Sequence, residues 1–294
     1  MLKLSTLKFF GCVICLCLST IGYTQIVPQN GLIGHYQLDG NAVDNSSYGH
    51  DGIIKGDVTP ATDRHGHVGK ACSFNGGFID AGNPVPYQIT GEMSISLWIQ
   101  PTDINTWRAL VTKWEGFGIG SFYLGINPGP QAVRWNVSDP IPVEGDSIKI
   151  NEWTHVVATY DNNFTKVYEN GVLVNQVAYT GGLSDVTRSL LIGAQDNDTT
   201  VTFYNFFGLM DDVLIYDRAL DATEVAIIYG LPATSTKDFS VLESVKVFPN
   251  PTNGIVNIEY DGYEAIEYTI FDAKGARLLS EKYEGSANIS HLPP

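Results

Sequence analysis

Carboxylate and amide side chains gather in one polar segment, residues 39–52, and again at the start of a late apolar run. The side chains that could supply oxygen ligands are Asp39, Asn41, Asp44, Asp51 and Asp211. Calcium takes six to eight oxygens from carboxylates, amides and backbone carbonyls. We therefore predict a calcium ion that stabilises the fold. The alternative is that these side chains bond to nearby backbone groups and form turns without a metal.

Only one of the adjacent carboxylates Asp211 and Asp212 is expected to face such an ion. Successive side chains of a strand point to opposite faces, so both could reach one ion only through a bulge. We favour Asp211 as the ligand.

Aromatic side chains offer a second kind of chemistry, because their flat faces stack on sugar rings. The candidates for ligand binding are Trp107, Trp114, Tyr123 and Trp135. Trp107 and Trp114 lie in polar surroundings, whereas Trp98 and Trp153 lie in alternating apolar segments and are expected in the core. The alternative for each of these tryptophans is packing in the interior.

Many short strands must position these side chains. Alternating apolar residues predict strands at 31–38, 70–80 with a break at two glycines, 94–100, 109–113, 122–126, 132–137, 152–160, 189–192 and 213–216, and a hairpin at 166–174. Asn170-Gly171 supplies the positive φ angles of a type I′ hairpin turn. Asp221, Glu224 and Gly230 predict one short, capped helix after the last of these strands. This pattern indicates an all-β sandwich or jelly roll.

Composition and the N-terminus restrict the location and the partners. A length of 294 residues allows about two domains. The net charge of −15 disfavours nucleic acid and anionic membrane surfaces as partners. Residues 1–24 have a basic start and an apolar centre, which predicts a cleaved signal peptide and no membrane span in the mature chain. Cleavage would leave Cys72 as the one cysteine, so no intramolecular disulfide could form.

Seven segments occur in the order typical of a known fold. They are Tyr36–Asn41, His50–Gly52, Gly69–Phe74, Ser94–Ile99, Trp153–Val157, Tyr168–Gly171 and Gly208–Leu220. Through them, residues 31–231 resemble the laminin-G-like jelly-roll family of the concanavalin A-like lectin/glucanase fold. The resemblance implies that the first and last strands are neighbours, which would bring the calcium ligands together. Glucanases of this fold carry a Glu-x-Asp-x-x-Glu run, which this sequence lacks, so we predict no catalytic residues.

The C-terminal part carries a second set of motifs. These are Val247–Pro251, Gly254, Val256, Ile258 and Ile270–Gly275. They resemble the type A sorting domain of the type IX secretion system of Bacteroidetes. We expect a linker at 232–243 and a small immunoglobulin-like β-sandwich at 244–294 that is truncated, since such domains usually continue beyond a segment like His291–Pro294. The resemblance implies export by the type IX machinery to the outer cell surface or beyond.

Together these features predict a secreted or cell-surface, non-catalytic binding module that recognises a polysaccharide or another glycan. Two alternatives remain open. One is a glycoside hydrolase of the same fold, and the other is an adhesion module that binds a cell-surface protein. The fold alone does not choose among them.

Overall fold

The structure is a computed structural model that describes residues 27–114, 120–138, 141–184, 187–197 and 204–230, together with the strands of a C-terminal module. The chain divides into two compact units, Met1–Ala233 and Thr234–Pro294. The predicted signal peptide and linker lie outside the described residues. None of the helices in the described part of the chain is long and apolar enough to cross a membrane.

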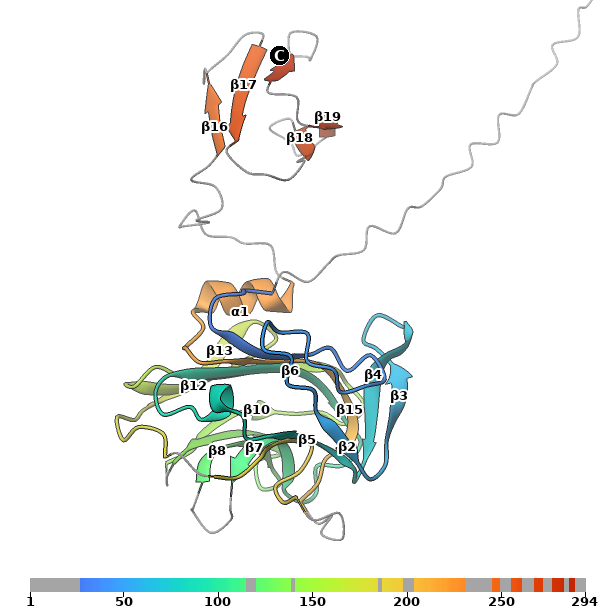
Figure 1. The fold of residues 1–294 in the computed structure, drawn as a ribbon, viewed down its shortest axis with the longest axis vertical. Coiled ribbons are helices and arrows are strands. Elements are labelled where there is room, and N and C mark those ends of the chain that lie inside the picture. Colours follow the sequence, from blue (N-terminus) through green and yellow to red (C-terminus); the bar gives the residue numbers. More distant parts are fainter. Residues whose placement is uncertain are drawn as a thin grey trace, which may run out of the picture. The chain divides into compact units, whose positions relative to one another are not determined.

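Two antiparallel sheets form the layers of the first unit (Figure 1). The first sheet has the spatial order β13 (Val172–Ala178), β12 (Phe164–Glu169), β11 (Thr154–Tyr160), β6 (Met93–Pro101), β15 (Phe207–Tyr216), β4 (Val68–Asn75) and β3 (Val58–Thr62), and β1 (Leu32–Tyr36) also pairs with β15. The second has the order β10 (Val143–Ser147), β9 (Ala132–Val137), β8 (Gly120–Asn127), β7 (Arg108–Trp114), β14 (Leu190–Ile192), β5 (Phe78–Gly82) and β2 (Ile53–Lys55). A 3-10 turn, η1 (Val85–Tyr87), follows β5. This arrangement confirms the predicted all-β jelly-roll sandwich.

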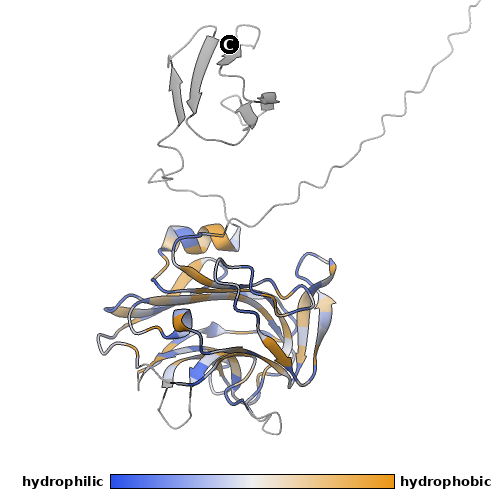
Figure 2. Ribbon diagram, in the orientation of Figure 1, coloured by the Kyte–Doolittle hydropathy of each residue, from blue (hydrophilic) through white to orange (hydrophobic). Residues whose placement is uncertain are grey.

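Strand alternation places the core between the sheets. In β6, Ile95, Leu97 and Ile99 are fully buried in the large apolar cluster between the layers. Ser96 and Trp98 point to the opposite face, as expected for neighbouring strand positions. Figure 2 shows apolar residues recurring along the strands of both sheets.

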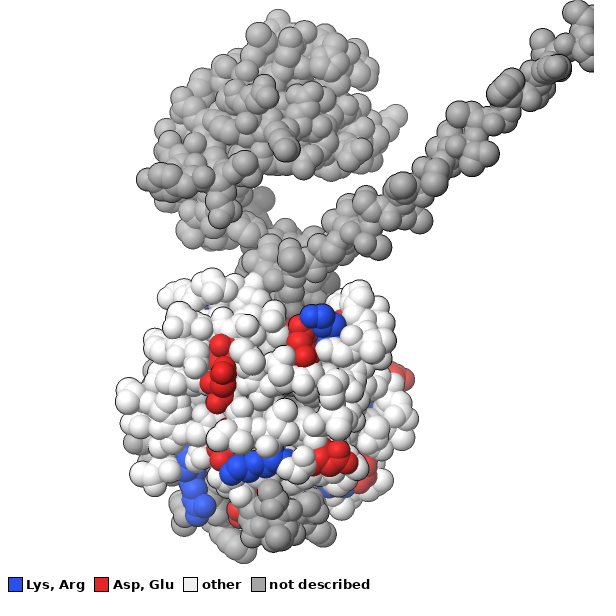
Figure 3. All heavy atoms as spheres, turned by 45° about the vertical axis from the view of Figure 1, so that its right-hand side comes forward, with Lys and Arg blue, Asp and Glu red and all other residues white. Residues whose placement is uncertain are grey.

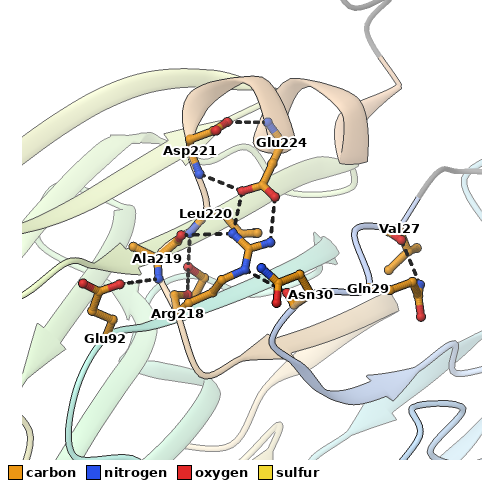
Figure 4. A network of polar contacts seen from close by, with 10 residues as sticks. Val27, Gln29, Asn30, Glu92, Arg218, Ala219, Leu220, Asp221 and Glu224 are labelled. Carbon is orange, nitrogen blue, oxygen red and sulfur yellow. Dashed lines mark hydrogen bonds and ion pairs between the residues drawn. The ribbon is translucent and has the colours of Figure 1, made fainter. Parts of the chain in front are cut away.

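The helix α1 (Ala222–Tyr229) begins and ends where the sequence predicts. Asp221 Oδ1 accepts a hydrogen bond from the Glu224 backbone N–H at 2.8 Å, and the Glu224 carboxylate accepts one from the Asp221 N–H at 3.1 Å (Figure 4). Arg218 donates to both oxygens of the same carboxylate, at 2.7 and 2.6 Å. Gly230 ends the helix with a φ of 95°. These contacts confirm the predicted capping box.

The outer face of the first sheet is covered by α1. The buried cluster beneath the helix consists of Leu32, Val157, Tyr168, Leu214, Tyr216, Leu220, Val225 and Ile228. Tyr229 stacks on Trp98 and His155, with ring centres 5.5 and 5.7 Å apart. The helix thus covers the part of this face that these residues form.

One predicted hairpin is present, and one predicted strand is divided between the two sheets. The hairpin β12–β13 turns at Asn170 and Gly171 with φ angles of 50° and 81°, which confirms the predicted turn. The predicted strand 70–80 is instead two strands, β4 and β5, in different sheets. The break falls at Gly77, where a Cβ would lie 2.5 Å from the backbone nitrogen of Asp57. The chain therefore crosses between the layers at the glycines.

Five strands of the second unit are described. A three-stranded sheet contains β16 (Val245–Phe248), β17 (Ile255–Tyr260) and β20 (Ser286–Asn288). A two-stranded sheet contains β18 (Glu267–Phe271) and β19 (Arg277–Lys282). The immunoglobulin-like arrangement of these strands stays a prediction.

Candidate functional site

A cavity of about 290 Å³ lies on the second sheet, and we call it the aromatic cavity. The described residues that line it are Trp107, Trp114, Tyr123, Arg134, Asn136, Gln195 and Tyr204. Three of the four aromatic residues predicted to bind a ligand are among them. Its volume lies close to the lower limit of small-molecule sites, which is about 300 Å³. The cavity therefore suits a small ligand or one unit of a larger one.

Strand β8 supplies the tyrosine of this cavity through simple alternation. Phe122, Leu124 and Ile126 are fully buried between the sheets, so Tyr123 and Gly125 face outward. A Cβ on Gly125 would lie 2.5 Å from a ring carbon of Tyr123. The glycine thus leaves room for the tyrosine ring to lie over the strand.

Strand β9 shows which tryptophan prediction is wrong. Val133 and Trp135 are fully buried in the core, and the Trp135 indole N–H donates to the Thr159 carbonyl at 3.2 Å. Arg134 and Asn136 occupy the alternate positions and line the cavity. Trp135 therefore packs in the interior and does not line the cavity. The apolar alternation of this strand is the signal that could have assigned both faces.

Arg134 is held in place by three contacts. Its guanidinium carbon lies 5.3 Å from the centre of the Trp107 ring, within the range of a cation–π contact. Its Nε donates to Asn136 Oδ1 at 2.8 Å, and one terminal nitrogen donates to Glu144 Oε1 at 2.9 Å. The Glu144 carboxylate thus balances the charge of the arginine beside the cavity.

Tyr123 carries an unused polar group. Its ring meets Trp114 edge to face, with ring centres 6.1 Å apart and planes at 67°. The side chain is 7% exposed, and its hydroxyl has no hydrogen-bond partner among the described residues. Burial raises the pKa of this hydroxyl above its usual value, so it stays protonated at neutral pH. This hydroxyl is therefore neutral and almost completely covered, and it is not open to a ligand in this structure.

Gln195 and Tyr204, which lie outside β7, β8 and β9, also line the cavity. The hydroxyl of Thr112 in β7 donates to the Ala194 carbonyl at 2.7 Å and so anchors the residue before Gln195. The Ala109 N–H donates to the Tyr204 carbonyl at 2.8 Å. Sequence reasoning missed Gln195 and Tyr204 because no local pattern relates these segments to β7.

In the polar segment, the carboxylates predicted to bind calcium accept hydrogen bonds from nearby backbone N–H groups and a hydroxyl. Asp44 is 5% exposed, and its two oxygens accept four hydrogen bonds. The donors are the backbone N–H groups of His35, Ser46 and His50 and the hydroxyl of Ser46, all at 2.8–2.9 Å. Asp51 Oδ1 in turn accepts from the Asp44 N–H at 2.9 Å. These bonds close the loop between β1 and β2.

The side-chain oxygens of Asp39 and Asn41 also accept hydrogen bonds. Lys70 donates to Asp39 Oδ2 at 2.5 Å, and the Val43 N–H donates to Asn41 Oδ1 at 3.0 Å. Both bonds occupy oxygens that a calcium ion would use. The local turn interpretation therefore accounts for this segment without a metal.

The paired aspartates of β15 both face one cation, which is an arginine. Arg64 contacts Asp211 Oδ2 at 2.5 Å and Asp212 Oδ2 at 2.8 Å, and its guanidinium lies 4.6 Å from the centre of the Trp98 ring. A bulge in the β15–β6 pairing, with Asp212 at a φ of 49°, turns both carboxylates the same way. Burial and the adjacent Asp212 raise the pKa of Asp211, while Arg64 opposes that rise.

The first and last strands of the sandwich are neighbours, as expected. Strands β1 and β15 pair through Tyr36 and Val213, as the resemblance implied. Among the described residues, no group of three or more His, Cys, Asp or Glu side chains could hold a metal ion. The arrangement therefore does not fit a calcium ion unless several of these hydrogen bonds are exchanged. Calcium binding stays a prediction.

A buried histidine lies beneath α1 and serves the fold. His155 Nε2 shares a hydrogen bond with the Ser96 hydroxyl at 2.9 Å. Complete burial, with a smaller contribution from Arg64, lowers the pKa of His155 to about 3. The imidazole is therefore neutral at all ordinary pH values. Tyr229 and Trp98 enclose it, which separates it from solvent.

Charged side chains do not gather into one region on the face of the first unit that Figure 3 draws. On the face drawn in Figure 3, charged side chains are scattered among uncharged ones and form no patch of a single sign. Many of the described acidic groups contact a cation, as Asp80 does with Lys55 at 2.9 Å. The aromatic cavity is therefore the strongest candidate site in the described part of the chain.

Comparison with known proteins gives two family matches. Residues 75–226 match the model described as the concanavalin A-like lectin/glucanases superfamily. Residues 246–293 match the secretion system C-terminal sorting domain. No curated protein sequence matches the chain.

Solved structures share the fold at low sequence identity. Domain 4 of AbnA, a GH43 extracellular arabinanase from Geobacillus stearothermophilus in complex with arabinotriose, is 23% identical, with a TM-score of 0.54 over 69% of this chain and 100% of that one. The binding domain of Paraclostridial Mosquitocidal Protein 1 is 15% identical, with a TM-score of 0.54 over 84% and 67%. The Trypanosoma rangeli sialidase in complex with sialic acid is 19% identical, with a TM-score of 0.50 over 69% of this chain and 33% of the sialidase.

These findings agree with the two-sheet architecture and with the motifs at the C-terminal end. The sorting domain directs export through the type IX secretion system to the cell surface or beyond. The chain belongs to the concanavalin A-like lectin/glucanase superfamily and carries a secretion system sorting domain.

Proposed function

We propose that this secreted or cell-surface protein binds carbohydrate in the aromatic cavity and does not cleave it. The observation that carries the proposal is the joining of Trp107, Trp114 and Tyr123 with amide and guanidinium groups around one cavity of about 290 Å³. Aromatic faces pack on the C–H faces of sugars, while amides and hydroxyls bond the sugar hydroxyls. Both kinds of group are present here within one small space.

The construction of the cavity supports binding of a ligand without a large rearrangement. Arg134 is fixed against Trp107 and bonded to Asn136, and Tyr123 is fixed against Trp114. Side chains that are already ordered lose little conformational entropy when a ligand arrives. The aromatic walls therefore exist before the sugar binds.

The family and the export route support the same function. A domain of similar fold from an extracellular arabinanase was solved in complex with arabinotriose, although the similarity to that domain shows the fold alone. Export places the chain where polysaccharides are the common ligands. Among the described residues of the cavity lining there is no pair of carboxylates, and Arg134 is the one charged side chain. Paired carboxyl groups are what most glycoside hydrolases require.

The test is retention of the secreted chain on a panel of insoluble polysaccharides that includes arabinan, with released reducing ends assayed in the supernatant. Trp107→Ala and Trp114→Ala should each lower retention at least tenfold, because each removes one aromatic wall. Trp153→Ala is the matched control, since this half-buried tryptophan does not line the cavity. Thermal melts of all three variants confirm that each remains folded.

Each outcome separates the proposed function from its rivals. Retention that depends on Trp107 and Trp114, with no released sugar, supports the binding module. Released reducing ends would support a glycoside hydrolase instead. Retention on cell-surface protein but on no polysaccharide would support an adhesion module.

A further inference from the structure

Strand β9 places two polar side chains next to each other on its outward face. Arg134 and Asn136 are alternate residues of this strand, so both point away from the core in which Val133 and Trp135 are buried. Both also line the aromatic cavity. One strand therefore supplies two neighbouring polar groups to the candidate site.

The contact between these two side chains fixes which atoms they present. Arg134 Nε donates to Asn136 Oδ1 at 2.8 Å. A guanidinium N–H can only donate, so the Asn136 atom that meets it must be the carbonyl oxygen, and the amide NH₂ faces the other way. The acceptor atom of the pair thus faces the arginine, and the groups left without a partner are N–H donors.

These donors are accessible, unlike the Tyr123 hydroxyl. Arg134 Nη1 donates to Glu144 Oε1 at 2.9 Å, whereas Arg134 Nη2 and Asn136 Nδ2 have no hydrogen-bond partner among the described residues. Neither nitrogen is among the fully covered polar atoms that lack a partner, but the Tyr123 hydroxyl is. The Arg134 side chain is 24% exposed. A ligand in the cavity can therefore reach both nitrogens.

Glu144 holds the guanidinium beside the aromatic surface. Glu144 and Arg134 are paired across the ladder of β10 and β9, and Glu144 Oε1 also accepts from Asn127 Nδ2 at 3.0 Å. The guanidinium carbon lies 5.3 Å from the centre of the Trp107 ring. A ligand that packs on Trp107 would therefore meet the N–H donors at its edge.

We propose that Arg134 and Asn136 form a polar recognition edge of the aromatic cavity, which binds acceptor oxygens of a glycan through N–H donors. Glu144 is a positioning residue that acts through Arg134. This inference rests on the proposed function and deepens it by naming specificity-determining residues and the ligand atoms that they bind. Hydroxyl oxygens of neutral sugars and carboxylate oxygens of uronic acids are both acceptors, and the experiment separates these two sources.

The first experiment changes the Asn136 donor into an acceptor. Asn136→Asp keeps an oxygen for Arg134 Nε and replaces the NH₂ by a second oxygen. Asn30→Asp is the matched control, because Asn30 is exposed and bonds Arg218 beside α1 through its backbone carbonyl. The full chain and both variants are titrated by calorimetry with arabinotriose, xylotriose, cellotriose, mannotriose and trigalacturonic acid. We expect Asn136→Asp to weaken every oligosaccharide that the wild type binds by at least about fivefold, and Asn30→Asp to leave each affinity unchanged.

The second experiment tests the arginine and its positioning. Arg134→Lys keeps a positive charge but loses the planar fork that bonds Asn136 and Glu144 together, so it should also weaken binding by at least about fivefold. Glu144→Ala should weaken binding in the wild type and cause no further loss in Arg134→Ala, because a positioning residue acts only through the group that it holds. A general loss of stability would not give this non-additivity. Thermal melts establish that each variant is folded, and the Arg134→Lys titration decides if Asn136→Asp is not.

The outcomes distinguish failure of this inference from failure of the proposed function. Wild-type affinity in Asn136→Asp or in Arg134→Lys, together with loss of binding in Trp107→Ala, would overturn the recognition edge and leave the proposed function intact. Additive losses in the Glu144 and Arg134 variants would overturn the positioning role. Loss in both edge variants supports the inference, and a preference for trigalacturonic acid or for a neutral trisaccharide then assigns the acceptor to carboxylate or hydroxyl oxygens. No binding of any oligosaccharide or polysaccharide by the wild type would overturn the proposed function itself.

Discussion

Replacing Asp44 tests whether hydrogen bonds or calcium organise the polar loop. The Asp44 carboxylate accepts four hydrogen bonds at 2.8–2.9 Å and is 5% exposed. In Asp44→Asn, one oxygen remains to accept from His35 and Ser46. The other becomes an NH₂ that faces the Ser46 hydroxyl and the His50 N–H, so these two donors lose their acceptor. Removing all side-chain acceptors requires Asp44→Ala.

The magnitude follows from these bonds. A hydrogen bond to a charged group contributes about 1.5–3 kcal/mol, and the Ser46 hydroxyl can turn toward the Ile33 carbonyl at 3.4 Å, so its loss costs little. We expect Asp44→Asn to lower the free energy of unfolding by about 2 kcal/mol and Asp44→Ala by about 4 kcal/mol. For a unit of this size, the first value corresponds to a melting temperature lower by roughly 4–8 °C.

The assay is urea and thermal unfolding of wild type and variants, each in excess calcium and in excess chelator. Asp57→Asn is the control, because Asp57 is exposed and bonds the side chain of Asn75 at 2.8 Å, and it should change stability by less than about 0.5 kcal/mol. If Asp44→Asn costs no more than this control, the hydrogen-bond reasoning is refuted. If chelation lowers the wild type to the level of Asp44→Asn and leaves that variant unchanged, the loop is a calcium site.

Two further predictions concern the ion pairs of Arg64 and the buried imidazole of His155. Arg64→Met leaves Asp211 and Asp212, with side chains 4% and 19% exposed, without their shared cation and should cost about 3 kcal/mol in urea unfolding. Adding Asp212→Asn to that variant should recover part of the loss, and no recovery would contradict the shared ion pair. His155 has a folded-state pKa of about 3, below its ordinary value of 6.5, so the unfolded chain takes up a proton first as the pH falls. Stability should therefore be lost from about pH 6.5 down to about pH 3, by at most about 1.4 kcal/mol for each pH unit, and an unchanged slope in His155→Asn would contradict this.

Local features of this chain can be predicted from the sequence because their causes are local. The capping box of Asp221 and Glu224 involves residues three apart, and the hairpin turn needs only two adjacent residues with positive φ. Alternation in β6 and β8 assigns each side chain to a face once the strand is recognised. The short strands β2, β3 and β10 escape prediction because each is short and partly exposed, and so carries little apolar pattern.

Whether an aromatic residue of a strand lies in the core or lines the cavity depends on which face of the sheet it occupies. Trp135 and Tyr123 both read as aromatic residues of strands, yet one is in the core and the other lines the cavity. The difference lies in which alternate set of residues is apolar. In β9 the apolar set includes Trp135, so Arg134 and Asn136 face outward.

Tertiary structure alone decided what the long-range partners are. Arg64 and Asp211 are 147 positions apart, and a bulge that no local pattern indicates allows Arg64 to reach both aspartates. The aromatic cavity combines β7, β8 and β9 with Gln195 and Tyr204 from a separate segment. Strand pairing sets such neighbours, and it depends on the packing of the whole core. The sequence by itself therefore determined the fold class, the export route and the candidate aromatic residues, while the packed sheets determined which of them share a site.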